Sequence, residues 1–177
     1  DGEGFWTSEC GKAGLGHVRL SIIDLKTGNQ PMVCSHDRYV IAYNGEIYNF
    51  KQIKQELVGF DFKTESDTEV ILNSFKRWGF DCINKFNGMF AFAIWDKSEK
   101  KLFLARDRFG IKPLYYFMEN KVLYFASEIK ALLPFQNKIE INQKGLSQYF
   151  NLQHNLGETT MFSGINNFPV ASFAQFS

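Results

Sequence analysis

A run of seven residues without a polar side chain limits the possible folds of this chain more than any other feature. Residues 89–95 read MFAFAIW. In an extended strand the side chains alternate between two faces, so Phe90, Phe92 and Ile94 share one face and two small alanines lie on the other. Both faces of this strand must therefore be covered by other layers of the protein, and a sheet with one solvated face is excluded.

Other short apolar runs, separated by turn-forming residues, predict a sheet-rich protein. Aromatic residues make up 16% of the chain, with 19 phenylalanines, and many of them fall in these runs. The short loop at residues 119–121 favours an antiparallel hairpin. The predicted strands cover residues 18–23, 39–43, 89–95, 102–106, 114–117 and 122–126.

Helices are predicted at fewer places. The clearest begins at Ser66, a capping residue with Glu69 three positions on, and ends at Gly79, where a left-handed closing residue is usually needed. Its expected apolar face consists of Ile71, Phe75 and Trp78. A second helix is expected at residues 50–57, and short helical turns at residues 127–133 and 144–150.

Composition limits the classes of function. A chain of 177 residues is expected to form one compact core. Twenty basic and nineteen acidic side chains, with no basic run, argue against a nucleic-acid partner. Cys10, Cys34 and Cys82 form no metal-binding pattern and fit a reducing cytoplasm. No apolar run is long enough to span a membrane, and the first residues do not read as a secretion signal.

Several polar residues stand at or near the ends of apolar strands, where a rigid scaffold can aim them at a ligand. Arg19 needs an anion, either in an internal salt bridge or in a bound carboxylate. Asn44 and Gly45 form either a hairpin turn or a pair of amide donors for an oxyanion. Asp67 either favours the positive end of its helix or also binds a ligand ammonium. Spacing does not decide between these alternatives.

Two further patterns contain residue types that binding or catalytic sites use. Residues 106–113 (RDRFGIKP) are rich in charge but lack the glycine spacing of a phosphate loop, so they are interpreted as a structural charge network. His17, His36 and His154 are scattered, and neither a metal cluster nor a serine-hydrolase triad can be drawn from them.

Taken together, the segments GHVRLSIIDL, GNQPM, YNGEIYNF, ESDTEVIL, NGMFAFAIWD, ARDRFGIKPLYY and FASEIKALL resemble one family. It is the class of glutamine amidotransferases with an N-terminal cysteine nucleophile, and within it the asparagine synthetases. The likeness runs from about residue 14 to about residue 165, in the order of the family. Each fragment alone is weak, whereas the ordered set is specific.

The resemblance implies an α+β fold of the Ntn-hydrolase type, a four-layer αββα sandwich of two antiparallel sheets. It also implies roles. Arg19 would bind the α-carboxylate of glutamine, Asp67 its α-ammonium, and Glu46 would lie beside it. Asn44 and Gly45 would form the oxyanion hole, and the same pocket would be lined by Leu20, Ser21, Ile22 and Ile23.

The resemblance also implies what lies outside the chain. The family's nucleophile would precede Asp1, because Cys10 is expected in a loop and has no free α-amine. Residues 1–142 are expected to be the glutaminase domain without its cysteine segment, and residues 143–177 an exit toward an ATP-dependent synthetase domain. ATP and Mg²⁺ would belong to that second domain, and none is expected here. Homodimerisation is a further expectation.

The leading hypothesis is a glutamine-hydrolysing domain that supplies ammonia to an asparagine synthetase in the cytoplasm, with the excerpt itself inactive. One alternative is a domain that only senses glutamine or holds a partner. Another is an amidotransferase for a different acceptor, such as a sugar of a surface polysaccharide. The residues before Asp1 would separate the first two, and the second domain would identify the acceptor.

Overall fold

The computed structural model of the chain describes residues 2–19 and 28–177, except for the side chain of Arg19. It contains two compact units, Asp1–Ala105 with Phe173–Ser177, and Arg106–Ser172. The expected single core is thus wrong, because each unit has its own hydrophobic cluster. The reason is that residues 106–172 form a long excursion between two strands of one sheet, and their apolar side chains pack with one another. The expected domain boundary after residue 142 concerns the parent protein and stays a prediction.

Five strands form the central sheet of the first unit, in the order β10-β6-β5-β4-β3. Strands β4 and β5 are antiparallel neighbours along their whole length. Phe90, Phe92 and Ile94 join the main hydrophobic cluster, while the alanines between them are also buried. The prediction that both faces of this strand are covered is therefore confirmed. The bounds are β3 Met32–Val33, β4 Tyr39–Ile47, β5 Gly88–Asp96, β6 Lys101–Arg106 and β10 Ser172–Phe176.

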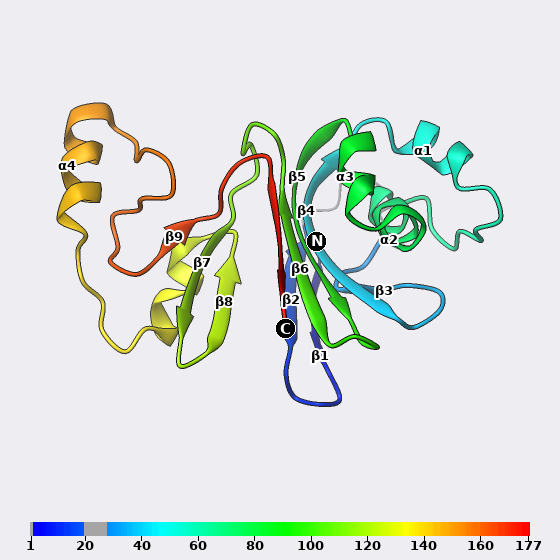
Figure 1. The fold of residues 1–177 in the computed structure, drawn as a ribbon, viewed down its shortest axis with the longest axis horizontal. Helices are drawn as coiled ribbons and strands as arrows, with labels where there is room; N and C mark the ends of the chain where they lie inside the picture. Colours follow the sequence, from blue (N-terminus) through cyan, green and yellow to red (C-terminus); the bar gives the residue numbers. More distant parts are fainter. Residues whose placement is uncertain (1, 20–27) are drawn as a thin grey trace. The chain divides into compact units, whose positions relative to one another are not determined.

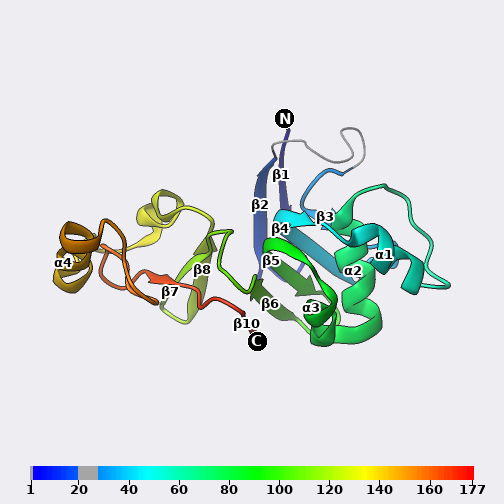
Figure 2. The same ribbon diagram turned by 90° about the horizontal axis from the view of Figure 1, so that it is seen from above.

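Layers cover both faces of this sheet. Helices α1 (Phe50–Glu56), α2 (Asp67–Trp78) and α3 (Cys82–Lys85) lie on one face, and the hairpin of β1 (Gly2–Thr7) and β2 (Gly14–Arg19) lies over the other (Figures 1 and 2). The described part of the first unit thus shows helices, a sheet and a second antiparallel sheet in that order. The predicted α+β class with antiparallel sheets is confirmed.

The start of α2 differs in detail from the expected capping box. The Ser66 hydroxyl accepts a bond from the Thr68 amide. The buried Glu69 carboxylate reaches further back, to the amides of Lys63 and Thr64 at 2.7–3.1 Å. Glu69 therefore ties the preceding loop to the helix, which fixes where α2 begins.

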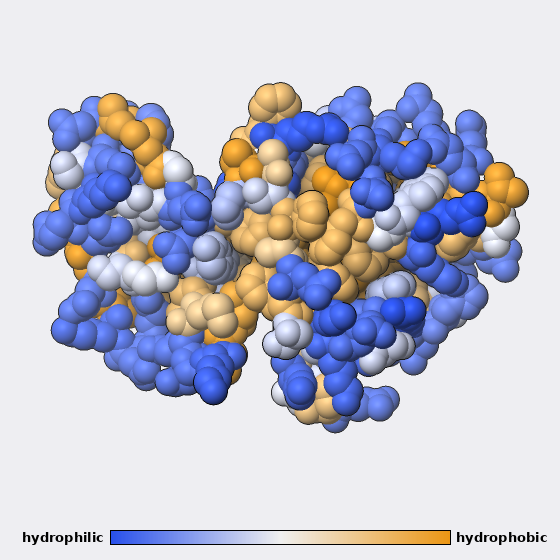
Figure 3. Space-filling model, viewed as in Figure 1, coloured by the Kyte–Doolittle hydropathy of each residue, from blue (hydrophilic) through white to orange (hydrophobic). Residues whose placement is uncertain are grey.

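The second unit contains the three-stranded sheet β8-β7-β9 and helix α4 (Gln143–Leu152). Its hairpin of β7 (Tyr115–Glu119) and β8 (Val122–Ala126) is as predicted, because Asn120 and Lys121 form a two-residue turn with positive φ angles. Apolar side chains emerge among polar ones over α4 in Figure 3. The exposed apolar residues of α4 are Tyr149, Phe150 and Leu152, and the remaining strand of this unit is β9, Asn166–Asn167.

Arg106, the last residue of β6, organises the second unit from a buried position. Its guanidinium donates hydrogen bonds of 2.6–2.9 Å to backbone carbonyls and one side chain. The acceptors are the carbonyls of Gly110, Lys112 and Phe168 and the side-chain oxygen of Asn167. The guanidinium thus binds backbone and side-chain acceptors within the protein. This confirms the interpretation of residues 106–113 as a structural network.

Asp107 complements Arg106 by binding amides in the same loop. Asp107 is 1% exposed, and its carboxylate accepts from the backbone amides of Phe109, Ile111 and Lys112 at 3.0–3.1 Å. Arg106 donates to several backbone carbonyls, and Asp107 accepts from several backbone amides. Together they satisfy polar backbone groups of a loop that has no regular secondary structure.

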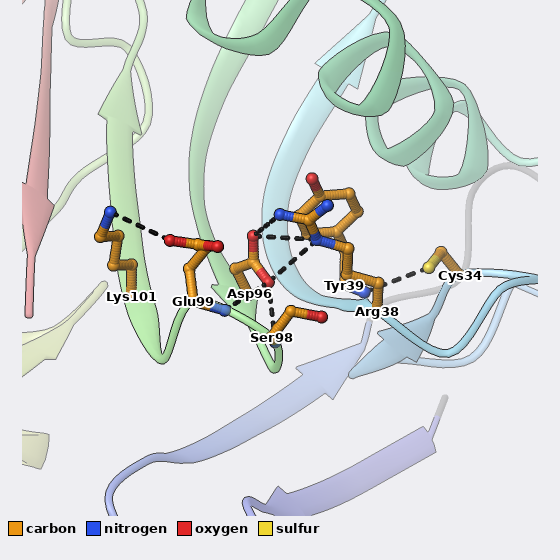
Figure 4. A network of polar contacts seen from close by, with 7 residues as sticks. All are labelled: Cys34, Arg38, Tyr39, Asp96, Ser98, Glu99 and Lys101. Carbon is orange, nitrogen blue, oxygen red and sulfur yellow. Dashed lines mark hydrogen bonds and ion pairs between the residues drawn. The ribbon is translucent and has the colours of Figure 1, made fainter.

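A second charge network closes the turn after β5 (Figure 4). Asp96 is 2% exposed and accepts a fork of bonds at 2.7–3.1 Å from the half-exposed Arg38 side chain. It also accepts from the amides of Ser98 and Glu99. Burial alone would raise the pKa of Asp96, but the bonds from Arg38 and the two amides together lower it.

Replacing Asp96 by asparagine is expected to lower the free energy of unfolding by about 2 kcal/mol at pH 7, because charge-assisted bonds are lost. The lowered pKa means that the carboxylate stabilises the fold above the pKa of unfolded aspartate, about 3.9, and that this stabilisation disappears as the pH falls through the folded pKa. Urea unfolding of both proteins between pH 7 and pH 3 should show a shrinking difference. A difference that stays constant with pH would contradict this assignment.

Candidate functional site

Asn44, Gly45 and Glu46 lie inside strand β4 and pair with Ala91, Phe90 and Met89 of β5. The alternative of a hairpin turn at Asn44-Gly45 is therefore wrong, as is the predicted end of the strand at residue 43. The strand continues because Ile47, beyond the triplet, is completely buried in the main cluster and because β5 offers a ladder partner for every residue.

Two glycines let the backbones of β4 and β5 approach closely beside this triplet. A Cβ atom on Gly45, whose φ is +155°, would lie 2.2 Å from the Met89 carbonyl oxygen. A Cβ atom on Gly88 would lie 2.2 Å from the Glu46 carbonyl oxygen. Neither position accepts a larger residue without movement of the strands, so the path of the backbone on both sides of Glu46 depends on glycine.

Asp67, the first residue of α2, carries its carboxylate to the same part of β4. The residue is 5% exposed. Its Oδ2 atom accepts a bond of 2.8 Å from the Tyr43 hydroxyl and one of 3.0 Å from the Ile47 amide. The two donors flank the 44–46 triplet. Asp67, which follows Ile47 by 20 residues, is therefore hydrogen-bonded at both ends of the triplet.

The triplet also faces a second element. Tyr43 and Ile47 belong to the cluster below the helices, so by the alternation of a strand Asn44 and Glu46 occupy the opposite face, toward the β1–β2 hairpin. Both are half-buried. From that hairpin the ring of His17 donates from Nε2 to the Tyr43 carbonyl at 2.9 Å.

Arg19 is the last residue of β2, two positions after His17, and its backbone pairs with Gly2. The contact of His17 with Tyr43 brings this end of β2 to the strand that holds the triplet. The Arg19 side chain and the predicted lining residues Leu20, Ser21, Ile22 and Ile23 lie outside the described residues. Their roles stay predictions.

Strand β2 begins four residues earlier than expected, at Gly14. The segment was missed because Gly14 and Gly16 lower its strand propensity, and strand β1 was missed because of Gly2 and Gly4. Gly4 is needed at its place, since a Cβ atom there would lie 2.1 Å from the carbonyl oxygen of Gln30. Segments 2–19 and 28–31 therefore come into close contact beside the candidate site.

Sequence reasoning assigned no role to Tyr43 and Gln30, which hold the site together, or to Asn49, which lies beyond the end of the same strand. The Asn49 side chain accepts from the Asn87 amide and donates to the Lys85 carbonyl, both at 2.9 Å, and so ties the end of the YNGEIYN segment to the start of β5. The only signal in the sequence is that all three residues fall in segments that the resemblance includes. Nothing in the sequence indicates their partners.

The three cysteines occupy positions consistent with the sequence interpretation. Cys34 and Cys82 are buried in the main cluster, as expected for packing residues, and burial raises the pKa of Cys82 to about 12. Cys10 is exposed in the loop between β1 and β2. That loop stands at the opposite end of the hairpin from Arg19, a distance of roughly 17 Å for strands of this length.

Two searches of the described residues bear on other classes of function. Within residues 2–19 and 28–177, no three histidine, cysteine, aspartate or glutamate side chains are grouped so that they could hold a metal ion. In the same part of the chain, no helix has the length and apolar character needed to cross a membrane.

Known proteins resemble the chain over most of its length. Residues 1–177 match the family described as a glutamine amidotransferase domain. Asparagine synthetase [glutamine-hydrolyzing] 1 of Bacillus subtilis is 46% identical over 155 residues, which are 86% of this chain and 24% of the relative. Asparagine synthetase [glutamine-hydrolyzing] 3 of the same organism is 43% identical over 92% of this chain and 28% of the relative. The chain thus spans about a quarter of the length of these relatives.

A solved structure shares the fold. The glutamine phosphoribosylpyrophosphate amidotransferase from B. subtilis, complexed with ADP and GMP, is 30% identical, with a TM-score of 0.60, over 69% of this chain and 29% of that protein. The sandwich of helices and antiparallel sheets, the ordered motifs and the match along all 177 residues agree with one another. The chain belongs to the glutamine amidotransferase family.

Proposed function

We propose that this chain binds glutamine and forms the glutamine-hydrolysing domain of a larger asparagine synthetase, to which it supplies ammonia. The observation that carries the proposal is the buried Asp67 carboxylate, bonded to Tyr43 and Ile47 on either side of the Asn44–Glu46 triplet. A carboxylate fastened to the strand that carries Asn44 and Gly45 is suited to a ligand with both an ammonium and a reactive carbonyl.

In this proposal the two charges of the free amino acid have separate partners. Asp67 takes the α-ammonium group and Arg19 takes the α-carboxylate with two parallel hydrogen bonds. Two opposite charges bound at fixed positions would select an amino acid over a simple amide, because a ligand lacking either charge would lose one of the two ionic contacts. The half-buried Glu46 would lie beside the bound ligand.

The chemistry assigned to the site is acyl transfer to a thiol. A cysteine thiolate attacks the side-chain amide carbon, and the carbonyl electrons move to the oxygen, where the amides of Asn44 and Gly45 would stabilise the charge. A base, which the resemblance identifies as the α-amine of that cysteine, takes the thiol proton and gives it to the nitrogen as the carbon–nitrogen bond breaks. Ammonia leaves, and water then hydrolyses the thioester to glutamate and restores the thiol.

The nucleophile is assigned to the parent's segment ahead of Asp1. Cys34 and Cys82 are buried, and the raised pKa of Cys82 keeps its thiol protonated. Cys10 is in the hairpin loop at the end away from Arg19. ATP and Mg²⁺, which activate the acceptor, are assigned to the rest of the parent protein. The parent is assigned to the cytoplasm, in agreement with three unpaired thiols.

The direct test is an assay of the complete parent protein. With its upstream segment present, it should release glutamate and ammonia from glutamine. Glutamine that is bound but not hydrolysed would favour a sensing domain instead. Neither binding nor hydrolysis would refute the proposal.

Replacing Arg19 by lysine in the complete protein is expected to weaken glutamine binding by about 2 kcal/mol, because the planar fork of two charge-assisted bonds is reduced to a point charge. Titration calorimetry measures the change. Arg77→Lys, an exposed position near the end of α2, is the matched control and should bind glutamine like the unchanged protein. Unchanged affinity of Arg19→Lys would refute the role of Arg19.

A further inference from the structure

Tyr43 is the residue at which the elements around the candidate site meet. It lies in β4 directly before Asn44 and is 3% exposed. Its hydroxyl reaches Asp67 of α2, its carbonyl accepts from His17 of β2, and its amide donates to the Gln30 side chain at 2.6 Å. One residue therefore has polar contacts with three segments that are distant in the sequence.

In the hydrogen bond between Tyr43 and Asp67, the Tyr43 hydroxyl is always the donor. Burial, followed by the negative charge of Asp67, raises the pKa of Tyr43 far above its ordinary value, so the phenol keeps its proton and acts as the donor. This bond and the Ile47 bond both end on Oδ2 of Asp67. They hold the carboxylate by this one oxygen, so the orientation of the carboxylate, and with it the direction of Oδ1, depends on both bonds.

The backbone of Tyr43 is held as firmly as its side chain. The amide is bound by Gln30, whose own side-chain nitrogen lies 3.5 Å from the Thr68 hydroxyl on α2, next to Asp67. The carbonyl is bound by His17, which must donate because a carbonyl oxygen can only accept. Since Tyr43 precedes Asn44, these contacts also fix the peptide from which the Asn44 side chain projects.

The ring of Tyr43 limits the space for a side chain at position 45 of the same strand. A Cβ atom on Gly45 would lie 2.9 Å from a ring carbon of Tyr43. The ring thus packs against the one residue of the triplet that has no side chain. Through its hydroxyl and ring, Tyr43 contacts Asp67 and the glycine of the triplet at the same time.

We propose that Tyr43 is a positioning residue for the binding of glutamine. Its hydroxyl orients the Asp67 carboxylate toward the substrate ammonium, so Tyr43 sets the affinity for glutamine rather than the rate of bond cleavage. The inference rests on the proposed function. It extends that function, because Tyr43 itself does not touch the reacting atoms. His17 and Gln30 support it by holding the backbone of Tyr43.

The test is Tyr43→Phe in the complete protein, which removes one hydroxyl and keeps the ring. The KM for glutamine should rise by roughly tenfold, the effect of one hydrogen bond to a buried charge, while kcat changes less than about twofold. Calorimetry with glutamine should show the same loss of affinity. The thermal midpoint of each variant shows whether the protein remains folded.

Tyr39→Phe is the matched control. Tyr39 lies four residues earlier on the same face of β4, is also buried, and packs its ring against Phe75. Loss of this hydroxyl should leave KM unchanged. An equal rise of KM in both variants would indicate a general effect of a lost buried hydroxyl and would overturn the inference.

A double-mutant cycle tests whether the hydroxyl acts through Asp67. With Asp67→Asn already present, adding Tyr43→Phe should raise KM much less than it does in the unchanged protein, because coupled residues are not additive. Fully additive effects, or a fall of kcat at constant KM, would overturn the inference. If the unchanged complete protein does not bind or hydrolyse glutamine, the proposed function fails first, and that outcome is distinct from a Tyr43→Phe variant that matches an active protein.

Discussion

Replacing Arg106 by methionine is expected to lower the stability of the second unit by about 4 kcal/mol, one of the larger effects that a single substitution has on a domain. The side chain donates to three backbone carbonyls and the Asn167 side chain from a buried position. Methionine fills part of the volume but donates nothing. The carbonyls of residues 110, 112 and 168 would then be buried without this donor, and each unsatisfied polar group adds to the loss.

Urea unfolding, together with hydrogen exchange, measures this effect. Exchange should accelerate at the amides of Phe109, Ile111 and Lys112, which depend on the loop that Arg106 holds. Lys112→Met removes a cation from the same loop, where the described bonds use the backbone of Lys112, and should change stability by less than about 1 kcal/mol. Equal losses in both variants would show that charge alone, and not the pattern of donors, stabilises the loop.

Local patterns predicted the elements of this fold well where side chains decide them. The doubly buried β5, the helix that begins after Ser66 and the turn at Asn120-Lys121 each follow from alternation, capping or backbone preference. Strands β1, β3 and β9 were missed because they are short or rich in glycine, and β9 and β10 also pair with strands far along the chain, β7 and β6. Such pairing leaves little trace in a local window of sequence.

The division into two units was also beyond local reasoning. Ser172–Phe176 returns to the central sheet as β10, and Phe173 stacks on Phe80 with ring centroids 4.1 Å apart. Contacts between residues more than 90 positions apart depend on tertiary packing. No periodicity in residues 143–177 indicates them.

The candidate site was predicted in part. Its polar residues stood out because a charge or an amide within or beside an apolar strand needs a hydrogen-bonding or charged partner. The structure places Asp67 against both flanks of the triplet. The scaffold was not predicted, because Tyr43 and Gln30 look like ordinary strand and loop residues. The incorrect hairpin at Asn44-Gly45 has the same origin, since the pair favours a turn in isolation and a ladder partner overrides that preference.

The second large effect is expected for Asn44→Ala in the complete protein. The kcat for glutamine hydrolysis should fall by roughly a hundredfold, because removal of one oxyanion donor has this effect in other acyl-transfer sites. KM should change little, since the amide would be most important after charge develops on the carbonyl oxygen. The position in the strand strengthens the expectation: a residue paired along β4 is held in place, and a donor that is already oriented needs no rearrangement during the reaction.

Asn49→Ala is the control from the same segment. Its side chain binds the Lys85 carbonyl and the Asn87 amide, so its loss should lower stability by about 1 kcal/mol and leave kcat within about twofold. Steady-state assays of the two variants separate catalysis from scaffold, because only Asn44→Ala should slow turnover in protein that remains folded. A change of KM alone in Asn44→Ala would assign Asn44 to ground-state binding and remove it from the oxyanion hole.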